Sequence, residues 1–479
     1  MLEEELYSLV RKVQKRQTEF QNVEVKAAAG GFPKRIYDSL SSFSNQDEGG
    51  TIIFGVSEKG NYEVVGVYNV ENAQKKAMEA CEQMEPAVRA VFTNTEIDGK
   101  IVLSAEVPPV EYWGRPVFYK GAGRLKGSYV RVGDADEPMS EYEVYSYEAF
   151  RRRLRDDLRT VPECRMDLLD QNRLSHYLEM VKQVRKNQSS LPDQEIMELM
   201  GITKRGELTL AAVLVFGIYP QAWFPQLCIT AVSVPGTEMG DTDRDGARFL
   251  DNKRITGSIP DMLEEAVDFV RRNMKTKTIV DSSGHRADKD EFPIVAVREA
   301  ILNALVHRDY SMMTENTPIS IEMYRDRMEV ISKGGLYGGG SVKQLGKGRA
   351  ETRNTTLANI LEDLRITENR YSGIPTIFRA FEEADLPKPE FVDERGVFKV
   401  RFRNGMEMPE TEIDKTDIHR AVVQFCMTPR SRDEITAFTG KSRYYTMSAI
   451  VQPLIDQERL KMTIPEKPKS PNQRYVADN

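Results

Sequence analysis

Cysteine and histidine are scarce in this 479-residue chain, which contains four of each. The cysteines are scattered far apart and form no CxxC pair, and they stand at Cys81, Cys164, Cys228 and Cys426. Structural zinc sites and disulfide frameworks depend on closely spaced cysteine and histidine residues. The sequence therefore argues against both kinds of site.

Long apolar runs are also missing. The longest, Leu210 to Ile218, is about half of the ~20 residues that a membrane span needs. The acidic start, Met1-Leu-Glu-Glu-Glu5, lacks the basic and apolar regions of a signal peptide. A GxxxxGK[ST] loop is absent, which argues against a motor of the P-loop type. We therefore expect a cytoplasmic protein without a membrane segment.

The composition is that of an ordinary globular protein, with 40% hydrophobic and 29% charged residues. At ~150 residues per domain, the length predicts about three domains. The 67 basic and 74 acidic residues give a net charge of −7, which disfavours a uniformly basic surface. From Asp414 onward, however, the chain has eleven basic and eight acidic residues. A local basic surface for nucleic acid is thus compatible with the acidic total.

The pattern of predicted elements indicates an α+β multidomain protein. We expect a first domain at 1–150, a helical connector at 151–200, a middle α/β subdomain at 201–289, an α/β domain at 290–405 and a C-terminal module at 414–479.

Within these parts, Thr51–Val56 and Tyr62–Val67 are predicted to form a hairpin. Ala211–Gly217 is predicted to be a strand. The segment from Glu143 to about Arg159, rich in tyrosine, arginine and acid, is predicted to be a solvated helix between two domains.

Glutamates and a lysine gather near the start of the chain. Glu24 and Lys26 lie two residues apart in a strand-like segment, so their side chains point to one face. With Glu19, and with Glu58 beyond the Gly49-Gly50 pair, they form a carboxylate set that suits a divalent cation, and the lysine would steady a phosphate. An ordinary acidic surface has the same spacing, so both interpretations stay open.

Several segments around these residues resemble one domain family. They are Glu19–Lys26, Leu40–Asn45, Gly49–Val56, Val64–Val67 and Tyr129–Gly133. Over roughly residues 10–150, they resemble the Schlafen-type AlbA-2 domain with its ExxxxEFK, SAFANxxGG and GVxDxG motifs. The resemblance implies an AlbA-2 α/β domain at 1–150.

In Schlafen proteins that cleave tRNA and ribosomal RNA, two glutamates of the first motif and an acid after the GV step form a metal-dependent nuclease site. By resemblance these are Glu19, Glu24 and Glu58, with Lys26 nearby and Mg²⁺ or Mn²⁺ as the metal. Val25 replaces the family's phenylalanine, and Ser57-Glu58 replaces a frequent Asp-Asp. Many bacterial AlbA-2 domains in proteins regarded as regulators keep these acids, so cleavage does not follow from them. In either case, the residues expected to contact phosphates are Lys120, Arg124, Lys126 and Arg131.

A second polar set recurs every four residues, at Glu299, Asn303 and His307. This spacing places the three side chains on one face of a predicted helix, Pro293–Val306. A glutamate with an asparagine one turn later suits a nucleotide site, in which the acid orients water and the amide holds magnesium. Taken alone, the spacing fits an exposed polar face equally well.

Downstream motifs favour the ligand interpretation. Arg298–Tyr310 is followed by Glu329–Gly339, by Arg353-Asn354 and by Ser372-Gly-Ile374. In this order they resemble a divergent branch of the GHKL ATPase family, the fold of gyrase B and histidine kinases, over roughly residues 290–405. The resemblance implies an α/β sandwich that binds ATP with Mg²⁺.

The same resemblance implies roles for individual residues. Glu299 would be the general base, Asn303 the magnesium ligand, and the loops at Gly334-Gly335 and Ser372-Gly373 the phosphate lids. Ser332 stands where typical GHKL proteins have an aspartate that recognises the adenine amine. Adenine selectivity, and nucleotide binding itself, therefore stay open. The remaining residues implied in cofactor binding are His307, Arg353 and Asn354.

The end of the chain has the element order of a winged helix-turn-helix. Three short helical patterns precede two strand-like segments, Arg459–Ile464 and Asn472–Val476, and Ser431 and Glu434 have capping-box spacing. The module at 414–479 resembles the winged helix that commonly ends this architecture, although winged helices also serve as protein-interaction or dimer modules. The residues expected to contact DNA are Lys441, Arg443, Tyr444, Tyr445, Lys467, Lys469 and Arg474.

Three functions fit these patterns. The leading hypothesis is a nucleotide-responsive, DNA-binding transcriptional regulator, expected to be a homo-oligomer because paired winged helices bind two-fold operators. The first alternative is a metal-dependent endoribonuclease acting on tRNA or ribosomal RNA, for example in phage defence. The second is a non-catalytic scaffold with a degenerate nucleotide site.

Overall fold

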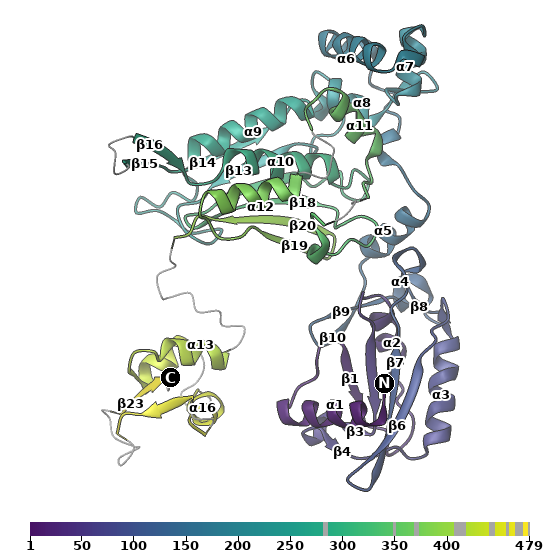
Figure 1. Ribbon diagram of the computed structural model, residues 1–479, viewed down its shortest axis with the longest axis vertical. Helices are drawn as coiled ribbons and strands as arrows, with labels where there is room; N and C mark the ends of the chain where they lie inside the picture. The colour runs from purple at the N-terminus through teal and green to yellow at the C-terminus, as the bar shows by residue number, and fades with distance from the viewer. Residues whose placement is uncertain are drawn as a thin grey trace. The chain divides into compact units, whose positions relative to one another are not determined.

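The computed structural model describes residues 1–280, 286–347, 351–367, 373–406, 418–439, 446–456, 459–464 and 473–477. The chain forms two compact units, Met1–Asn404 and Gly405–Asn479. Helices and several sheets alternate along it, which confirms the predicted α+β multidomain class (Figure 1). No described helix is both long and apolar enough to cross a membrane.

The N-terminal domain has a four-stranded sheet with helices on both faces (Figure 1). Its side chains alternate: Ile52 packs in the core beneath α2 and α3, whereas Ile53 packs against α1. The helices are α1 (Glu3–Arg16), α2 (Tyr37–Ser44) and α3 (Val70–Glu82). In sheet order, the strands are β1 (Val23–Lys26), β2 (Gly50–Phe54), β7 (Lys100–Val107) and β6 (Val91–Ile97).

The hairpin predicted from Thr51 to Val67 is wrong over most of its length. Only β3 (Val56–Ser57) and β4 (Glu63–Val64) pair with each other. β2 instead pairs in parallel with β1 and antiparallel with β7. Its apolar residues are buried on both faces of the sheet. The backbone of a strand in that position forms hydrogen bonds with two neighbouring strands of the main sheet.

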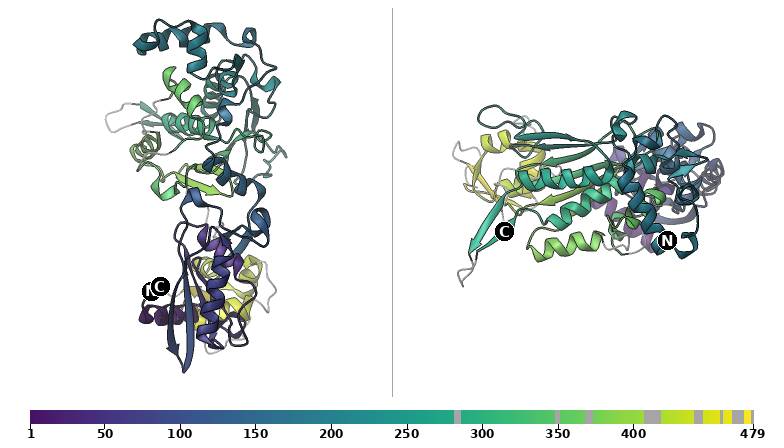
Figure 2. Two further views of the ribbon diagram at one scale, coloured as in Figure 1. Left: turned by 90° about the vertical axis from the view of Figure 1, so that its right-hand side faces the viewer. Right: turned by 90° about the horizontal axis from the view of Figure 1, so that it is seen from above.

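The second domain is a six-stranded sheet with helices on one face (Figure 2). The helices are α9 (Ile259–Asn273), α10 (Ile294–His307) and α12 (Gly373–Glu383). β13 and β17 are parallel, and the other neighbours are antiparallel. In sheet order, the strands are β14 (Asp251–Ile255), β13 (Ile229–Ser233), β17 (Ile319–Met323), β18 (Arg327–Lys333), β20 (Val397–Arg403) and β19 (Glu390–Glu394).

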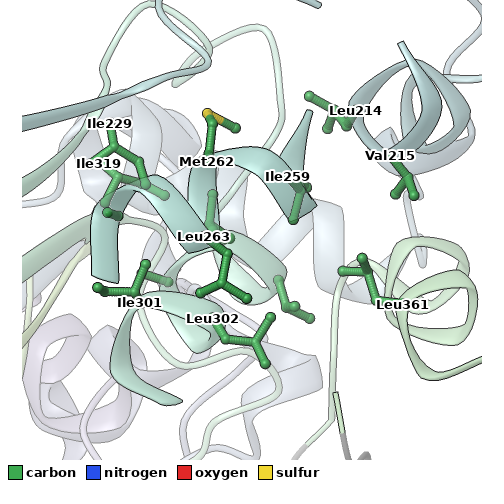
Figure 3. Close-up of a cluster of buried hydrophobic side chains, with 14 of the residues drawn as sticks. Leu214, Val215, Ile229, Ile259, Met262, Leu263, Ile301, Leu302, Ile319 and Leu361 are labelled. Atoms are coloured by element: carbon green, nitrogen blue, oxygen red, sulfur yellow. The ribbon is translucent and has the colours of Figure 1, made fainter. Parts of the chain in front are cut away.

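One hydrophobic core runs through this whole region, from Val161 to Phe402. Figure 3 shows side chains from α8 (Leu210–Phe216), α9, α10 and α11 (Thr355–Asp363) meeting in it. The helices α6 (Gln171–Val184) and α7 (Asp193–Leu199) contribute to the same core. The predicted boundaries near residues 200 and 290 thus fall inside a continuous core.

The strand predicted at Ala211–Gly217 is wrong, because this segment is the helix α8. All seven of its residues are buried, so the apolar run has no polar face to reveal a helical period. The hydroxyl of Thr209 accepts a hydrogen bond from the Ala212 amide, at 3.3 Å, and caps the helix.

The C-terminal unit packs short helices on a three-stranded sheet. The predicted capping box is present: the Ser431 amide donates to Glu434 Oε2 at 2.7 Å, and the Glu434 amide donates to Ser431 Oγ at 3.3 Å. The elements are α13 (Ile418–Phe425), α14 (Arg432–Thr439), a π-helical turn (Thr446–Val451), α16 (Gln452–Asp456), and the strands β21 (Arg430–Ser431), β23 (Arg474–Ala477) and β22 (Leu460–Met462).

Asn45, at the end of α2, ties the N-terminal domain together. It is buried; its Oδ1 accepts from the Val117 amide at 2.7 Å, and its Nδ2 donates to the carbonyls of Val117 and Tyr129.

Asn45→Ala leaves these buried backbone groups without hydrogen-bond partners and should lower the free energy of unfolding by about 2–4 kcal/mol. Urea denaturation measures the loss. Asn94→Ala, at an exposed position of β6, is the matched control, and equal midpoints for the two variants would contradict the assignment.

Candidate functional sites

Helix α10 brings Glu299, Asn303 and His307 together along one wall of a pocket of about 670 Å³. The Asn303 amide donates to Glu299 Oε1 at 3.0 Å. The apolar residues of the helix, such as Ile301 and Leu305, point into the core. The three polar residues therefore line a cavity, as the ligand interpretation of their spacing expects.

Two glycine-containing segments form the other walls. Leu336–Gly340 and Ser341–Lys347 lie on one side, and Gly373 and Ile374 lie on the other. A Cβ atom at Gly373 would collide with the Glu299 carboxylate. A side chain at this position would therefore displace the carboxylate, which is the flexible end of the Glu299 side chain. Ser372, predicted to act beside Gly373, lies outside the described residues.

The His307 ring faces this pocket and lies 3.2 Å, at Nδ1, from the Thr352 hydroxyl. Although the His307 side chain is exposed at the pocket, desolvation by the surrounding protein and the nearby positive charge of Arg353 lower its pKa. The imidazole is therefore neutral at pH 7. It can offer a ligand a hydrogen bond but no positive charge.

A second cavity, of about 130 Å³, adjoins the first between α10 and the sheet. Ala300 and Ala304 of α10 line it opposite Val330 of β18 and Val400 of β20. Sequence reasoning missed this inner cavity. Its only sequence signal is a pair of alanines, one helical turn apart, in a helix whose other buried positions are mostly larger.

Arg353 and Asn354 both donate hydrogen bonds to backbone carbonyls of the protein. Arg353 Nη2 donates to the Gly335 carbonyl at 2.7 Å, so it positions the glycine-rich loop while also lining the inner cavity. Asn354 is buried, and its Nδ2 donates to the carbonyls of Val306 and Arg308, both at 2.8 Å. Its amide therefore secures the end of α10, and a role of Asn354 in cofactor binding stays a prediction.

The outer side of the glycine-rich loop packs against aromatic residues of other segments. Phe150, in α5 (Glu141–Arg151), lies with its ring centroid 5.0 Å from that of Tyr112 and 5.1 Å from that of Tyr337 in the loop. Tyr112 belongs to the N-terminal domain, in the turn Tyr112–Gly114. At Gly339, where φ is +77°, a Cβ atom would lie 2.7 Å from the Tyr112 Cβ. The loop therefore lies between the pocket and the N-terminal domain.

Polar contacts reinforce this packing. The Tyr142 hydroxyl of α5 donates to Asp309 Oδ2 at 2.7 Å, and Arg353 Nη1 lies 3.3 Å from the same oxygen. Arg395 forms an ion pair with Glu137 at 2.7 Å. The expectation that α5 is a solvated helix is wrong: most of its side chains are half-buried, because its aromatic residues pack against the second domain. The tyrosine-rich composition was the available signal.

In the N-terminal domain, Glu24 and Lys26 form an ion pair on one face of β1, as their spacing predicts. The buried guanidinium of Arg131 joins this group from β9 (Tyr129–Val132). Arg131 Nη1 donates to Glu24 Oε2 at 2.8 Å and to Asp136 Oδ1 at 2.9 Å, and Nη2 lies 3.6 Å from Glu19 Oε2. Two protein cations, Arg131 and Lys26, are therefore already paired with carboxylates of this group.

The donor set does not fit Mg²⁺ or Mn²⁺. The described residues contain no group of three histidine, cysteine or acidic side chains arranged to hold a metal. Glu58 is exposed in the short turn Glu58–Gly60. Burial, together with the neighbouring Glu24 carboxylate, raises the pKa of Glu19 well above its ordinary value.

The four basic residues expected to contact phosphates have different environments. Arg131 is buried among carboxylates, so the expectation that it contacts phosphate is wrong. Arg124 forms an ion pair with Glu148. Lys120 and Lys126 are exposed, although the Lys120 ammonium also donates to the Glu82 carbonyl at 3.0 Å.

Most residues predicted to contact DNA in the C-terminal unit lie outside the described part of the chain: Lys441, Arg443, Tyr444, Tyr445, Lys467 and Lys469. Arg474 is described, on β23. Its Nη1 donates to the Pro429 carbonyl at 3.2 Å and lies 3.6 Å from Glu434 Oε2. Its side chain is half exposed, and its charge is partly balanced by Glu434.

Comparisons with known proteins match separate parts of the chain. Two solved structures are similar at low identity. One is the DIP2311 protein of Corynebacterium diphtheriae, at 17% identity over 95% of this chain and 93% of that one, with a TM-score of 0.41. The other is the N-terminal domain of a "Putative ATP-dependent DNA Helicase RecG-related Protein" of Nitrosomonas europaea, at 24% identity over 27% of this chain and 90% of that one, with a TM-score of 0.23. No curated protein matches the chain.

Three family models match. The Schlafen AlbA_2 family matches residues 19–140, and the family described as "Putative ATP-dependent DNA helicase recG C-terminal" matches residues 316–402. A domain family of unknown function matches residues 148–230. The chain therefore carries a Schlafen AlbA_2 domain, followed by an ATPase-like domain of the RecG C-terminal family.

Proposed function

We propose that this protein is a cytoplasmic, nucleotide-responsive DNA-binding regulator. The observation that carries the proposal is the position of the glycine-rich loop Gly334–Gly340. One side of the loop lines the pocket beside Glu299 and Asn303, and the other side packs against Tyr112 and Phe150. A ligand that orders the loop would therefore act on contacts made by the N-terminal domain.

The pocket has the two parts that a nucleotide needs. The inner cavity is mainly apolar and suits a base, whereas the outer pocket is more polar than the inner cavity and suits phosphates. Lys347 and the glycine-rich loop line the outer part. Asn303 would hold Mg²⁺ on the phosphates, and Glu299 is placed one helical turn away to orient water. A bound metal would supply charge neutralisation of the phosphates.

Support for nucleic-acid binding comes from the domain matches and from exposed basic residues. The matching models are a Schlafen family and a family named for a DNA helicase. Lys120 and Lys126 are exposed on the AlbA_2 domain. In the proposal, the C-terminal unit is a winged helix that contacts DNA, and two copies of the chain bind a two-fold operator.

The coupling in the proposal depends on how firmly the loop is held. The Leu336 amide donates to Asp393 Oδ2 at 2.8 Å, the Gly334 amide donates to the Gly396 carbonyl at 2.9 Å, and Arg353 holds Gly335. A loop fixed at several points transmits a displacement at one surface to the other. By linkage, a nucleotide that alters DNA affinity must itself bind differently when DNA is present.

Mg-ATP should change the dissociation constant for duplex DNA by at least about fivefold, the lower range of allosteric coupling. Fluorescence anisotropy at one fixed salt concentration measures the change, since phosphate contacts make affinity salt-dependent. Asn303→Ala should abolish the response. Asn172→Ala, at an exposed helical position, should keep it. Equal affinity with and without Mg-ATP, under conditions where a thermal shift shows ATP bound, would contradict the regulatory role.

RNA cleavage is not part of the proposal, because Glu24 is already paired with Arg131 and Lys26. Incubation of tRNA with the full chain and Mn²⁺ should give no cleavage that depends on Glu24. Gel electrophoresis of the RNA compares the natural protein with Glu24→Gln, which keeps the shape of the side chain. Products made by the natural protein and lost in the variant would establish the nuclease alternative.

A further inference from the structure

The inner cavity is a narrow slot between one helix and two strands. Ala300 and Ala304 of α10 lie opposite Val330 of β18 and Val400 of β20. Because alanine side chains are short, the helix and the sheet leave a cavity of about 130 Å³ here. A flat ring suits such a slot, since aliphatic side chains would contact both of its faces.

Ser332 is the polar side chain that β18 contributes to this slot. It continues the inward row of Met328 and Val330 and is only 5% exposed. Among the described residues, none forms a hydrogen bond with its hydroxyl. A buried hydroxyl that lines a cavity without a protein partner is a recognition group for whatever enters the cavity.

The chemistry of this group determines what it accepts. A serine hydroxyl rotates, and it offers one donor and two acceptor positions. It can accept a hydrogen bond from an exocyclic amino group or donate one to an exocyclic carbonyl. An ionised carboxylate at the same position would only accept, and would therefore favour the amino group.

We propose that the inner cavity takes a purine base and that Ser332 lets it bind 6-amino and 6-oxo purines alike. This inference rests on the proposed nucleotide function and names its substrate class: purine nucleoside triphosphates without discrimination at the 6-position.

Among the residues that the structure describes, Glu351 is the one acidic side chain that lines the inner cavity, and it also lines the outer pocket. It is exposed, so water competes for its carboxylate, and an exposed hydrogen bond discriminates weakly. If Glu351 recognised the base instead, its replacement by glutamine would change the preference between the two purine types.

The test is isothermal titration of the full chain with Mg²⁺ and three nucleotides. ATP and ITP differ only in the 6-amino or 6-oxo group and its ring proton, and CTP controls for ring size. The variants are Ser332→Asp, Ser332→Ala and Glu351→Gln. The matched control is Ser320→Ala in β17. The Ser320 hydroxyl donates a hydrogen bond to Glu322, and Ser320 does not line the cavity.

The natural protein should bind ATP and ITP with dissociation constants within about tenfold of each other, and CTP at least about tenfold more weakly. Ser332→Ala should weaken both purines by a similar factor, about three- to tenfold. Ser332→Asp should weaken ITP at least about tenfold relative to ATP. The ATP-to-ITP ratio within one variant is insensitive to a general loss of stability, and Glu351→Gln and Ser320→Ala should leave it unchanged.

Three results would overturn the inference alone: a natural protein that prefers ATP over ITP more than a hundredfold, an unchanged ratio in Ser332→Asp, or a changed ratio in Glu351→Gln. If no nucleotide binds the natural protein at millimolar concentration, the proposed function fails and this inference fails with it. The two failures are therefore distinguishable.

Discussion

The arrangement of this protein depends on the glycine-rich loop, which makes contacts on two sides. Residues 334–340 approach the pocket on one side and the rings of Tyr112 and Phe150 on the other. Side chains at Gly339 would separate the loop from Tyr112, and a side chain at Gly373 would displace Glu299. Close packing against Tyr112 requires glycine at position 339, and this packing also joins the AlbA_2 domain to the ATPase-like domain.

Both candidate sites contain glutamates, but the charges around these glutamates differ between the two sites. In the N-terminal domain, Glu24 is paired with Lys26 and with buried Arg131, so its charge is already satisfied. In the second domain, Glu299 and Asn303 border a polar cavity. A buried carboxylate paired with a guanidinium serves the fold, because breaking such a pair leaves an unpaired charge in a poorly solvated place. A carboxylate that borders a cavity can contact a molecule that enters it.

Local patterns predicted much of this structure, and contacts between distant segments account for what was missed. The four-residue spacing of Glu299, Asn303 and His307 placed them on one helix face, because helical geometry is local. The partnership of Arg131 with Glu24 spans 107 positions, and no periodicity reveals it. The role of Phe150 was missed for the same reason, since its partners lie far away in the chain. α8 was missed because burial on every side removes the polar residues that mark a helical period.

Hydrogen exchange of the full chain, with and without Mg-ATP, tests the central claim most directly. Exchange reports how often each backbone amide opens. If the loop links the two domains, Mg-ATP should slow exchange in Leu336–Gly340 and also around Tyr112 and in the part of α5 that carries Phe150. Protection confined to the walls of the pocket, with the segments around Tyr112 and Phe150 unchanged, would contradict the account.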